Sequence, residues 1–420
     1  MTGKEAVEYI DTYWLHQTQP SLHRIRDLMN RLGNPHLQTK YIHVAGTNGK
    51  GSTCAMLASI PQQAGYKTGL FTSPHILHFG ERMQVNGVPI SEEELAEITE
   101  FVRPHAEAME EAVNEFELIT AIGFTYFARQ RCDIVVLEVG LGGEFDATNI
   151  IPAPECAVIM NIGLDHTALL GHTEPEVARC KAGIIKEGCD VVIYRGLPEV
   201  EAVFSEVCLE KGARLHKPSF GSIRSLSVGI EGQTFDALEY KALFLPLAGE
   251  HQQRNATVAL TAAQVLRTKG WRIGEEEIRR GLSRVKWPVR FEVVDRHPVF
   301  IIDGGHNPQC LEAVREGLRT LLPGRRVVFL TGVLADKDVG EMAALLGEAG
   351  SEYVTVTPNS PRAMGAEELA VVLRRLGKEA HPCQSIQEGI EKSREMAGKD
   401  GVVCCVGSLY LAGEVRSHFS

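Results

Sequence analysis

A glycine-rich run, GTNGKGS at Gly46–Ser52, is the part of this sequence that points most directly to chemistry. It follows a strand-like segment, Tyr41–Ala45, and opens a helix-like one, Ser52–Ala64. A glycine-rich turn between a strand and a helix places consecutive backbone N–H groups around a phosphate, and the helix N-terminus adds partial positive charge. Lys50 would reach the terminal phosphates of a nucleotide. The run therefore predicts a nucleotide-binding loop rather than a simple glycine turn.

This loop departs from the common P-loop pattern at two positions. Val44 stands where the pattern has a glycine, and Gly51 follows the lysine where the pattern has Ser or Thr. The hydroxyl that usually binds magnesium is therefore displaced, so the ion must draw ligands from elsewhere. Ser73, held before Pro74 in a non-helical stretch, is one source of that hydroxyl, and an ordinary serine turn is the competing interpretation.

Polar side chains gather at the ends of apolar, strand-like runs, namely Glu138, Asp165, His166, Asp303 and His306. In open α/β sheets, ligands bind beyond the carboxyl ends of the strands. A buried carboxylate there is costly unless it is paired or bound to a metal, which favours a functional role for Glu138 over capping or ion pairing. Magnesium takes oxygen ligands and keeps several waters, so a serine, a glutamate and a histidine would serve one or two such ions together with phosphate oxygens.

Lys181 lies in the run KAGII, which is apolar enough to suggest partial burial. Burial disfavours the charged ammonium, lowers the pKa of a lysine and leaves a reactive amine. A solvated surface lysine is the alternative, because most lysines are exposed.

Strand-like and helix-like runs alternate along the chain, which predicts an α/β fold with mostly parallel sheets and helices on both faces. In the first part we expect strands at Tyr41–Ala45, Asp133–Val139, Cys156–Ile162 and Asp190–Tyr194, and helices that include Glu92–Val113 and Leu118–Arg129. Short alternating runs at Ser225–Leu245 predict a small antiparallel excursion, after which helices return at Gln252–Lys269 and Glu275–Leu282.

The stretch SRVKWPVRFEVV marks a domain junction, because Pro288 ends the preceding helix. We predict a first domain over residues 1–287 and a second α/β domain over residues 288–420. In the second domain the alternation restarts, with strands expected at Val299–Asp303, Val327–Gly332, Tyr353–Thr357 and Val402–Gly407.

Composition excludes several classes of protein. The 420 residues carry a net charge of −11 with no long basic run, which argues against nucleic acid as a partner. No stretch of 18 apolar residues exists, so no membrane span is expected, and the polar N-terminus lacks the features of a signal peptide. The ten cysteines form no C-x-x-C pair and are interpreted as reduced thiols. We expect a cytoplasmic enzyme and a monomer.

Together these segments resemble the folylpolyglutamate synthase and dihydrofolate synthase family, within the Mur-type ATP-dependent amide ligases. The resemblance spans nearly the whole chain, with motifs in the order GTNGKGS, FTSPH, LEVGLGGEFDATN, GLDHTALLG, KAGIIK, GEHQQRNA, WPVRFE, DGGHNP, GVLADKD and VGSLYLAGEVR. It implies a P-loop, ATP-binding domain of the Mur ligase central type with a small antiparallel sheet. It also implies a Rossmann-like C-terminal α/β domain, with the active site in the cleft between the two.

The resemblance further implies roles for single residues. ATP would contact Thr47, Asn48, Gly49, Lys50, Gly51, Ser52, Asn255, Arg290 and Asp303. Magnesium would be held by Ser73, Glu138 and His166, and Lys181 would be carbamylated, its new carboxylate holding a second magnesium. His306 would face the nucleotide in the active site. The pteridine end of the substrate would lie near Phe116, Glu117, Phe145, Asp146 and Ala147.

The implied reaction transfers the ATP γ-phosphoryl group to a folate-type carboxylate. The amine of L-glutamate then attacks the acyl phosphate, and ADP and phosphate are released. Whether the carboxylate substrate is dihydropteroate, a reduced folate or both stays open, because Glu144 and Phe145 stand where many relatives have an arginine before an LDATN-like segment. A second departure, DGGHNP for DGAHNP, leaves Asp303 and His306 in place.

Two other functions compete with this one. A Mur-type ligase for a cell-wall nucleotide precursor would share the loop, but the FTSPH and DGGHNP segments and the lack of a third, N-terminal domain argue against it. A nucleotide-dependent regulatory protein without catalysis is the second alternative. The presence of Lys50, Ser73, Glu138, His166 and Lys181 argues against that.

Overall fold

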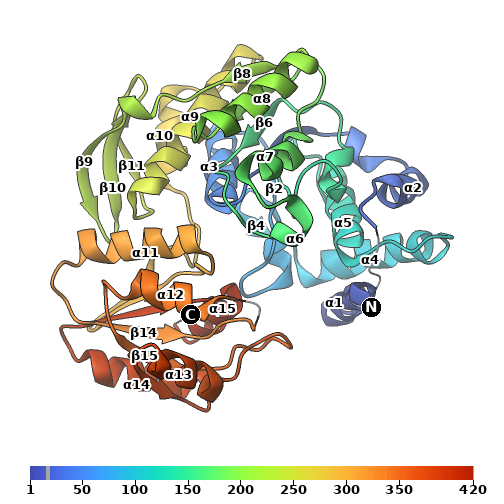
Figure 1. The fold of residues 1–420 in the computed structure, drawn as a ribbon. Helices are drawn as coiled ribbons and strands as arrows, with labels where there is room; N and C mark the ends of the chain where they lie inside the picture. The colour runs from blue at the N-terminus through green and yellow to red at the C-terminus, as the bar shows by residue number, and fades with distance from the viewer. Residues whose placement is uncertain (16–18, 336, 420) are drawn as a thin grey trace. The chain divides into compact units, whose positions relative to one another are not determined.

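The structure is a computed structural model that describes residues 1–15, 19–335 and 337–419 (Figure 1). Asp336, in the GVLADKD segment, lies outside the described residues. The chain separates into two compact units. The first comprises Met1–Ile223, Asp236–Leu243 and Arg254–Val285, and the second comprises Arg224–Phe235, Phe244–Gln253 and Lys286–Ser420. The domain boundary expected between residues 287 and 288 stays a prediction.

The first unit is built on an eight-stranded sheet with the order β4-β3-β2-β5-β1-β6-β7-β8. Its strands are β1 Lys40–Ala45, β2 Thr68–Phe71, β3 Met83–Val85, β4 Val88–Pro89, β5 Ile134–Glu138, β6 Cys156–Ile159, β7 Asp190–Ile193 and β8 Arg214–His216. All neighbours pair in parallel except β2 with β3 and β3 with β4. The four strands predicted for this part of the chain are confirmed.

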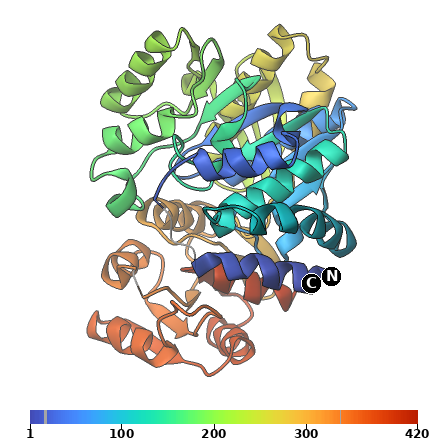
Figure 2. The ribbon, with the colours of Figure 1, turned by 90° about the vertical axis from the view of Figure 1, so that its right-hand side faces the viewer.

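Helices cover both faces of this sheet (Figures 1 and 2). They are α1 Gly3–Asp11, α2 His23–Arg31, α3 Lys50–Gln63, α4 Glu92–Glu107, α5 Glu115–Arg129, α6 Thr167–Leu170, α7 Glu174–Ala182, α8 Pro198–Glu210, α9 Glu250–Thr268 and α10 Glu275–Ser283. Short 3-10 turns lie at Thr12–Leu15, Pro35–Leu37, Phe79–Arg82, Ala147–Ile150 and Phe220–Ser222. Because successive strand residues face opposite sides, Tyr41 and Leu137 pack with α5, while α3 packs on the other face.

The helix predicted over Glu92–Val113 ends earlier, at Glu107. Residues 108–113 separate α4 from the next helix, α5, whose N-cap is Asn114. The Asn114 side chain accepts from the Glu117 N–H, and the Glu117 carboxylate accepts from the Asn114 N–H. Such a reciprocal cap satisfies two backbone donors at a helix start. It fixes the position at which α5 begins, and the candidate substrate residues Phe116 and Glu117 lie in its first turn.

The antiparallel excursion predicted at Ser225–Leu245 is a three-stranded sheet with the order β11-β10-β9. Its strands are β9 Arg224–Gly229, β10 Gly232–Ala237 and β11 Tyr240–Leu245.

The second unit contains a six-stranded sheet with the order β12-β13-β17-β14-β15-β16, in which only β12 and β13 are antiparallel. Its strands are β12 Glu292–Arg296, β13 Val299–Ile302, β14 Val327–Thr331, β15 Glu352–Thr355, β16 Glu379–Pro382 and β17 Val402–Val406. Its helices are α11 Pro308–Leu321, α12 Val339–Leu346, α13 Ala366–Arg375, α14 Ile386–Ala397 and α15 Leu409–Ser417. The central strands are buried along their whole length, as their unbroken apolar runs predict.

Across residues 1–15, 19–335 and 337–419, the structure contains no helix with both the length and the apolar character needed to span a membrane.

Candidate active site

The glycine-rich loop joins the carboxyl end of β1 to the first turn of α3. Gly46 and Gly49 have positive φ angles of 146° and 82°, a region that side chains disfavour. A Cβ on Gly46 would lie 2.6 Å from the Met160 side chain. The Thr47 N–H donates to the Asn161 carbonyl at 2.8 Å, and its hydroxyl donates to the Gly163 carbonyl at 3.0 Å. These contacts hold the loop against the segment that follows β6.

Gly49 is the N-cap of α3, and no side chain caps this helix. The Lys50 ammonium folds back over the loop and donates to the Thr47 carbonyl at 3.2 Å. A Cβ on Gly49 would lie 2.9 Å from the Asn255 Oδ1 atom, so the carboxamide of α9 lies directly against the loop. The structure thus brings together the loop residues and Asn255, which the sequence separates by some two hundred positions.

Ser73 and Glu138 meet at the carboxyl ends of the neighbouring strands β2 and β5. The Ser73 N–H donates to the Glu138 Oε2 atom at 3.2 Å, and the Glu138 side chain is buried. The Ser73–Pro74 peptide bond is cis. The backbone of Ser73 therefore contacts the Glu138 carboxylate. The two side chains offer a hydroxyl and a carboxylate oxygen, the kind of donor that magnesium prefers.

Glu81 organises the segment that carries Ser73. Its carboxylate accepts the backbone N–H groups of Ile76 at 2.8 Å, Leu77 at 3.1 Å and His78 at 3.1 Å. The Arg82 guanidinium donates to the His75 Nδ1 atom at 3.0 Å and fixes that ring as well. Sequence reasoning missed Glu81. Glu81 stands three residues after His78, the N-cap of the FGER turn, and this spacing is typical of a reciprocal cap. The spacing is the signal that could have identified it.

His166, the third expected magnesium ligand, follows β6. It has a positive φ of 50°, precedes α6, and its N–H donates to the Asp165 Oδ1 atom at 2.9 Å. Its imidazole is more than half exposed. Among the residues that the structure describes, no three His, Cys, Asp or Glu side chains are grouped in a metal-binding arrangement.

Lys181 is buried near the end of α7, which confirms the predicted burial. Burial, together with the positive charge of Lys50, lowers the pKa of Lys181 from 10.5 to about 7, although Asp165 and Asp146 act in the opposite direction. Near neutral pH a large share of this side chain is therefore an uncharged amine. Its backbone also supports the LGGEF segment, because a Cβ on Gly143 would lie 3.0 Å from the Lys181 Cα atom.

The segment Phe145–Ala147 begins at the last residue of LGGEF, and the Asp146 side chain anchors it. The buried Asp146 carboxylate accepts from the Leu141 N–H at 2.9 Å, from the Thr148 N–H at 3.0 Å and from the Thr148 hydroxyl. Burial raises the pKa of Asp146, and the contact with the Thr148 hydroxyl opposes that rise. The Phe145 ring, by contrast, is more than half exposed. The segment therefore presents an aromatic surface on a rigid base.

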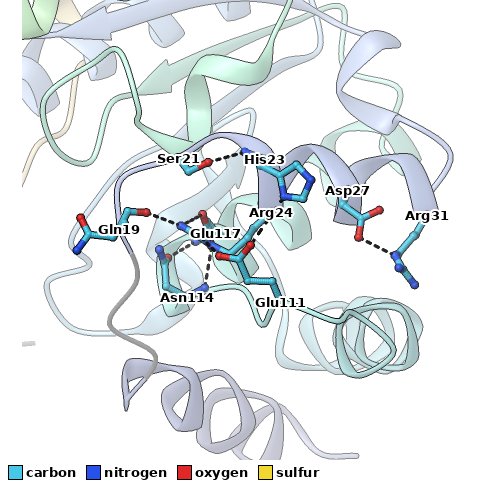
Figure 3. A network of polar contacts seen from close by, with 9 residues as sticks. All are labelled: Gln19, Ser21, His23, Arg24, Asp27, Arg31, Glu111, Asn114 and Glu117. Atoms are coloured by element: carbon cyan, nitrogen blue, oxygen red, sulfur yellow. Dashed lines mark hydrogen bonds and ion pairs between the residues drawn. The ribbon is translucent and has the colours of Figure 1, made fainter.

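Phe116 and Glu117 face different surroundings although they are adjacent. The Phe116 ring lies against Gly140, where a Cβ would approach its Cζ atom to 2.5 Å, and packs edge-on against Phe71. The Glu117 carboxylate instead belongs to a buried network (Figure 3), in which the Arg24 guanidinium donates to it through Nε at 3.1 Å and Nη2 at 3.0 Å.

The same guanidinium also donates to Glu111 and to the Gln19 carbonyl, and it is only 3 % exposed. Glu117 is thereby engaged by Arg24 and by its own helix cap, so the contacts of its carboxylate are with the protein. Sequence reasoning missed Arg24, because nothing in the local pattern shows that α2 packs on α5.

In the second unit, Arg290, Asp303 and His306 gather around Gly304. The buried Asp303 carboxylate accepts from the Phe291 N–H at 2.8 Å and the Gly305 N–H at 2.7 Å. Burial raises the pKa of Asp303, and the Arg290 charge opposes that rise. His306 donates through Nδ1 to the Gly304 carbonyl at 2.9 Å, which leaves Nε2 as the basic nitrogen.

Two protein families match the chain. The Mur ligase middle domain matches residues 44–263, and the Mur ligase glutamate ligase domain matches residues 289–409. The folylpolyglutamate synthase of Lacticaseibacillus casei is 36 % identical, over 99 % of this chain and 98 % of its own length. The dihydrofolate synthase/folylpolyglutamate synthase of Bacillus subtilis is 35 % identical, over 96 % of this chain and 97 % of its own length.

Solved structures resemble the chain over its full length. The folylpolyglutamate synthase of Mycobacterium tuberculosis complexed with ADP has a TM-score of 0.91 and 30 % identity, covering 100 % of this chain and 98 % of that one. An FPGS–AMPPCP–folate complex has a TM-score of 0.87 and 34 % identity, covering 100 % of this chain and 99 % of that one.

Proposed function

Because the chain belongs to the Mur ligase family, and its similar relatives include folylpolyglutamate and dihydrofolate synthases, we propose that it joins L-glutamate to a folate-type carboxylate at the expense of ATP. The observation that carries the proposal is the uncapped, glycine-rich start of α3, where Lys50 lies over the loop and Asn255 lies against it. A carboxylate does not condense with an amine at neutral pH unless it is first activated. Phosphorylation by ATP supplies that activation.

In the proposed reaction, the substrate carboxylate attacks the γ-phosphorus of ATP, ADP leaves, and an acyl phosphate forms. The neutral amine of L-glutamate then adds to the acyl carbon, and phosphate departs from the tetrahedral intermediate. Phosphoryl transfer depends mainly on positioning and on offsetting negative charge. Lys50 and the N–H groups of residues 47–52 fit that task.

Magnesium would be held by Ser73, Glu138 and His166. The first two residues fit the ion, because the Ser73 backbone contacts the buried Glu138 carboxylate at the strand ends and both side chains offer hard oxygen donors. Bound there, the ion would neutralise charge on the phosphoryl oxygens. Glu81 maintains this arrangement through its three backbone contacts with the segment that follows Ser73.

We infer that Lys181 is carbamylated and would supply a second carboxylate near the first. Carbon dioxide reacts with the neutral amine and not with the ammonium, and the pKa of about 7 makes the neutral form abundant at physiological pH. Incubation with ¹³C-bicarbonate would give a carbamate carbon signal in wild-type protein that is missing in Lys181→Arg. The same signal in both proteins would contradict the assignment.

The pteridine end of the substrate would rest on Phe116 and Phe145, with Asp146 and Ala147 forming the base of the segment. Glu117 would support the substrate site indirectly. Its carboxylate fixes the start of α5 and thereby the position of the adjacent Phe116. In the second unit, Arg290 and Asp303 would contact ATP, and His306 would face it through the side on which Nε2 lies.

The decisive test is ADP release measured with ATP, L-glutamate and a panel of dihydropteroate, tetrahydrofolate and methylene-tetrahydrofolate. We expect release with at least one member, dependent on glutamate, and a product heavier by one glutamyl residue in mass spectrometry. A flat response across the panel would refute the function. Release without glutamate dependence would favour a nucleotide-dependent regulatory protein. The relatives do not favour the cell-wall precursor ligase.

A further inference from the structure

A buried histidine that the proposed reaction does not use lies behind the substrate segment. His43 is in the middle of β1, in register between Leu137 of β5 and Ala157 of β6, and it is fully buried. An imidazole in such an apolar layer costs free energy unless its polar atoms are hydrogen-bonded. The hydrogen bonds of the His43 ring therefore indicate its role.

His43 contacts the substrate segment through one hydroxyl. Its Nε2 atom lies 2.9 Å from the Thr148 Oγ1 atom, and that hydroxyl in turn contacts the Asp146 Oδ1 atom. The chain separates His43 from Thr148 by 105 positions, so only the fold joins them. His43, Thr148 and Asp146 thus form a linear series of side chains that runs from the core of the sheet to the base of the segment Phe145–Ala147.

The direction of the hydrogen bonds follows from the number of protons. Burial lowers the pKa of His43 to about 3, so the ring is neutral and carries one N–H. The Thr148 hydroxyl has a single proton, and an ionised Asp146 can only accept. The hydroxyl therefore donates to Asp146 and accepts from the Nε2–H group of His43. The Nδ1 atom, which has no hydrogen-bond partner within the described residues, is then the unprotonated one.

The series determines the orientation of the Asp146 carboxylate. One oxygen accepts from Leu141, and the other accepts from the backbone and hydroxyl of Thr148. Without the imidazole donor, the hydroxyl could rotate away from Asp146 and the carboxylate would lose its only side-chain donor among these contacts. Asp146 caps the 3-10 turn that starts at Ala147, so a shift of its carboxylate would displace Phe145 and Ala147 as well.

We propose that His43 is a positioning residue that holds the segment Phe145–Ala147 in place for the folate-type substrate, acting through Thr148 and Asp146. The proposal rests on the proposed function, since it takes this segment as the contact for the pteridine end. It predicts an effect on that substrate alone. A merely structural histidine would change stability without separating one substrate from another.

The experiment compares variants that keep or remove each donor. His43→Leu and Thr148→Val remove the donors, while His43→Gln and Thr148→Ser keep an N–H or O–H near the same place. We expect the first two to raise the KM for the folate-type substrate about tenfold, the cost of one lost hydrogen bond at a buried carboxylate, with kcat and the KM for ATP unchanged. The conservative pair should stay close to wild type. His43→Leu combined with Thr148→Val should be no worse than either change alone, because both break one series.

A second buried histidine provides the matched control. His36 is also buried, beside Phe124, and burial lowers its pKa to about 4, but among the described residues its ring makes no hydrogen bond to Thr148 or Asp146. His36→Leu should change thermal stability without changing the KM for the folate-type substrate. Equal KM effects at His36 and His43 would overturn the proposal, as would a parallel rise in the KM for ATP.

One measurement does not depend on turnover or on any variant. In protein labelled with ¹⁵N-histidine, the His43 ring should show its proton on Nε2 and remain neutral down to about pH 5. A proton on Nδ1 would overturn the series. Wild-type protein that turns over no folate substrate would refute the proposed function instead, so the two failures are distinguishable.

Discussion

Two regions of this molecule share one topology and differ in chemistry. In the first unit, β1 runs through a glycine-rich turn into α3, and in the second unit, β13 runs through the turn Gly304–Asn307 into α11. Gly49 begins α3 with a left-handed backbone and no side-chain cap. Asn307 begins α11, and its side chain accepts from the Cys310 N–H at 3.0 Å.

The difference shows that topology alone does not make an anion site. The N-terminus of α3 has no capping side chain, and Lys50 adds a full positive charge to it. The start of α11 is capped by a residue of its own, and Pro308 removes one further N–H donor. The identity of the residue at the N-cap therefore decides which of the two turns can receive a phosphate.

One buried titratable group from each region, a lysine and an aspartate, extends the comparison to pH. The first region buries Lys181, whose pKa is lowered, within the field of Lys50. The second buries the carboxyl of Asp303, whose pKa is raised. Each group resists its charged form because of burial, so Lys181 and Asp303 should make stability depend on pH with opposite signs.

Lys50→Ala should produce the largest effect on turnover. Removing the cation proposed to contact the γ-phosphate is expected to lower kcat at least a hundredfold, roughly 3 kcal/mol, because charge on the phosphoryl group is no longer offset. The measurement is steady-state ADP release. Lys40→Ala, at the exposed start of the same strand, is the control and should keep its rate. Near-normal turnover in Lys50→Ala would contradict the claim that the start of α3, unlike that of α11, serves a phosphate.

Lys181→Met tests the buried lysine through pH. The pKa of Lys181 is 10.5 in the unfolded chain and about 7 in the folded chain. Between these two pH values the unfolded state therefore binds more protons than the folded state. The stability of the wild-type protein consequently rises with pH over this range. The variant should gain up to roughly 5 kcal/mol below pH 7, and the gain should shrink as pH rises toward 10.5. Urea unfolding in CO₂-free buffer from pH 6 to 10 would measure it.

Asp303→Asn is the counterpart in the second region. Its folded pKa is raised, so the folded state holds the extra proton, and the pH-dependent gain of this variant should be present at neutral pH and lost as pH falls toward the ordinary aspartate range. Slopes of the same sign in both variants would show that the two regions do not differ as described.

Gly49→Ala should have an intermediate effect. The left-handed backbone costs an alanine about 1–2 kcal/mol, and the new Cβ would crowd Asn255. Gly65→Ala has a similar φ of 88° with open space around it, so it carries the backbone cost without the contact. We expect similar losses of stability but a higher KM for ATP only in Gly49→Ala. An equal KM in both would show that the loop tolerates the displacement of Asn255.

Asn307→Ala should have the smallest effect, a loss of about 1 kcal/mol in the free energy of unfolding, because α11 loses its cap. Asn307→Ser, which can still cap, should retain most of the stability. Denaturant titration of both variants measures the difference. An unchanged midpoint in Asn307→Ala would mean that the cap contributes nothing and that the two helix starts are more alike than their contacts indicate.

Local features of this protein could be derived from its sequence, because they depend on neighbouring residues. The GTNGKGS run predicted the glycine-rich turn between β1 and α3, the apolar runs located β1, β5 and β14, and the apolar surroundings of Lys181 predicted its burial. The end of the helix at Glu107 was missed, since a cap at Asn114 becomes decisive only when α5 has a core to pack against.

Contacts between distant residues were decided by the tertiary structure alone. Ser73 meets Glu138 because β2 and β5 are neighbours in the order β2-β5-β1-β6, which no local pattern encodes. Glu117 was expected at the substrate, yet Arg24, 93 positions earlier, engages its carboxylate. In the sequence, His43 is a single polar residue within a predicted strand. Only the packing of η4 (Ala147–Ile150) onto the sheet places Thr148 beside it. Side-chain types and their backbone setting are local properties, whereas the partner of a buried polar group is set by how the strands are ordered.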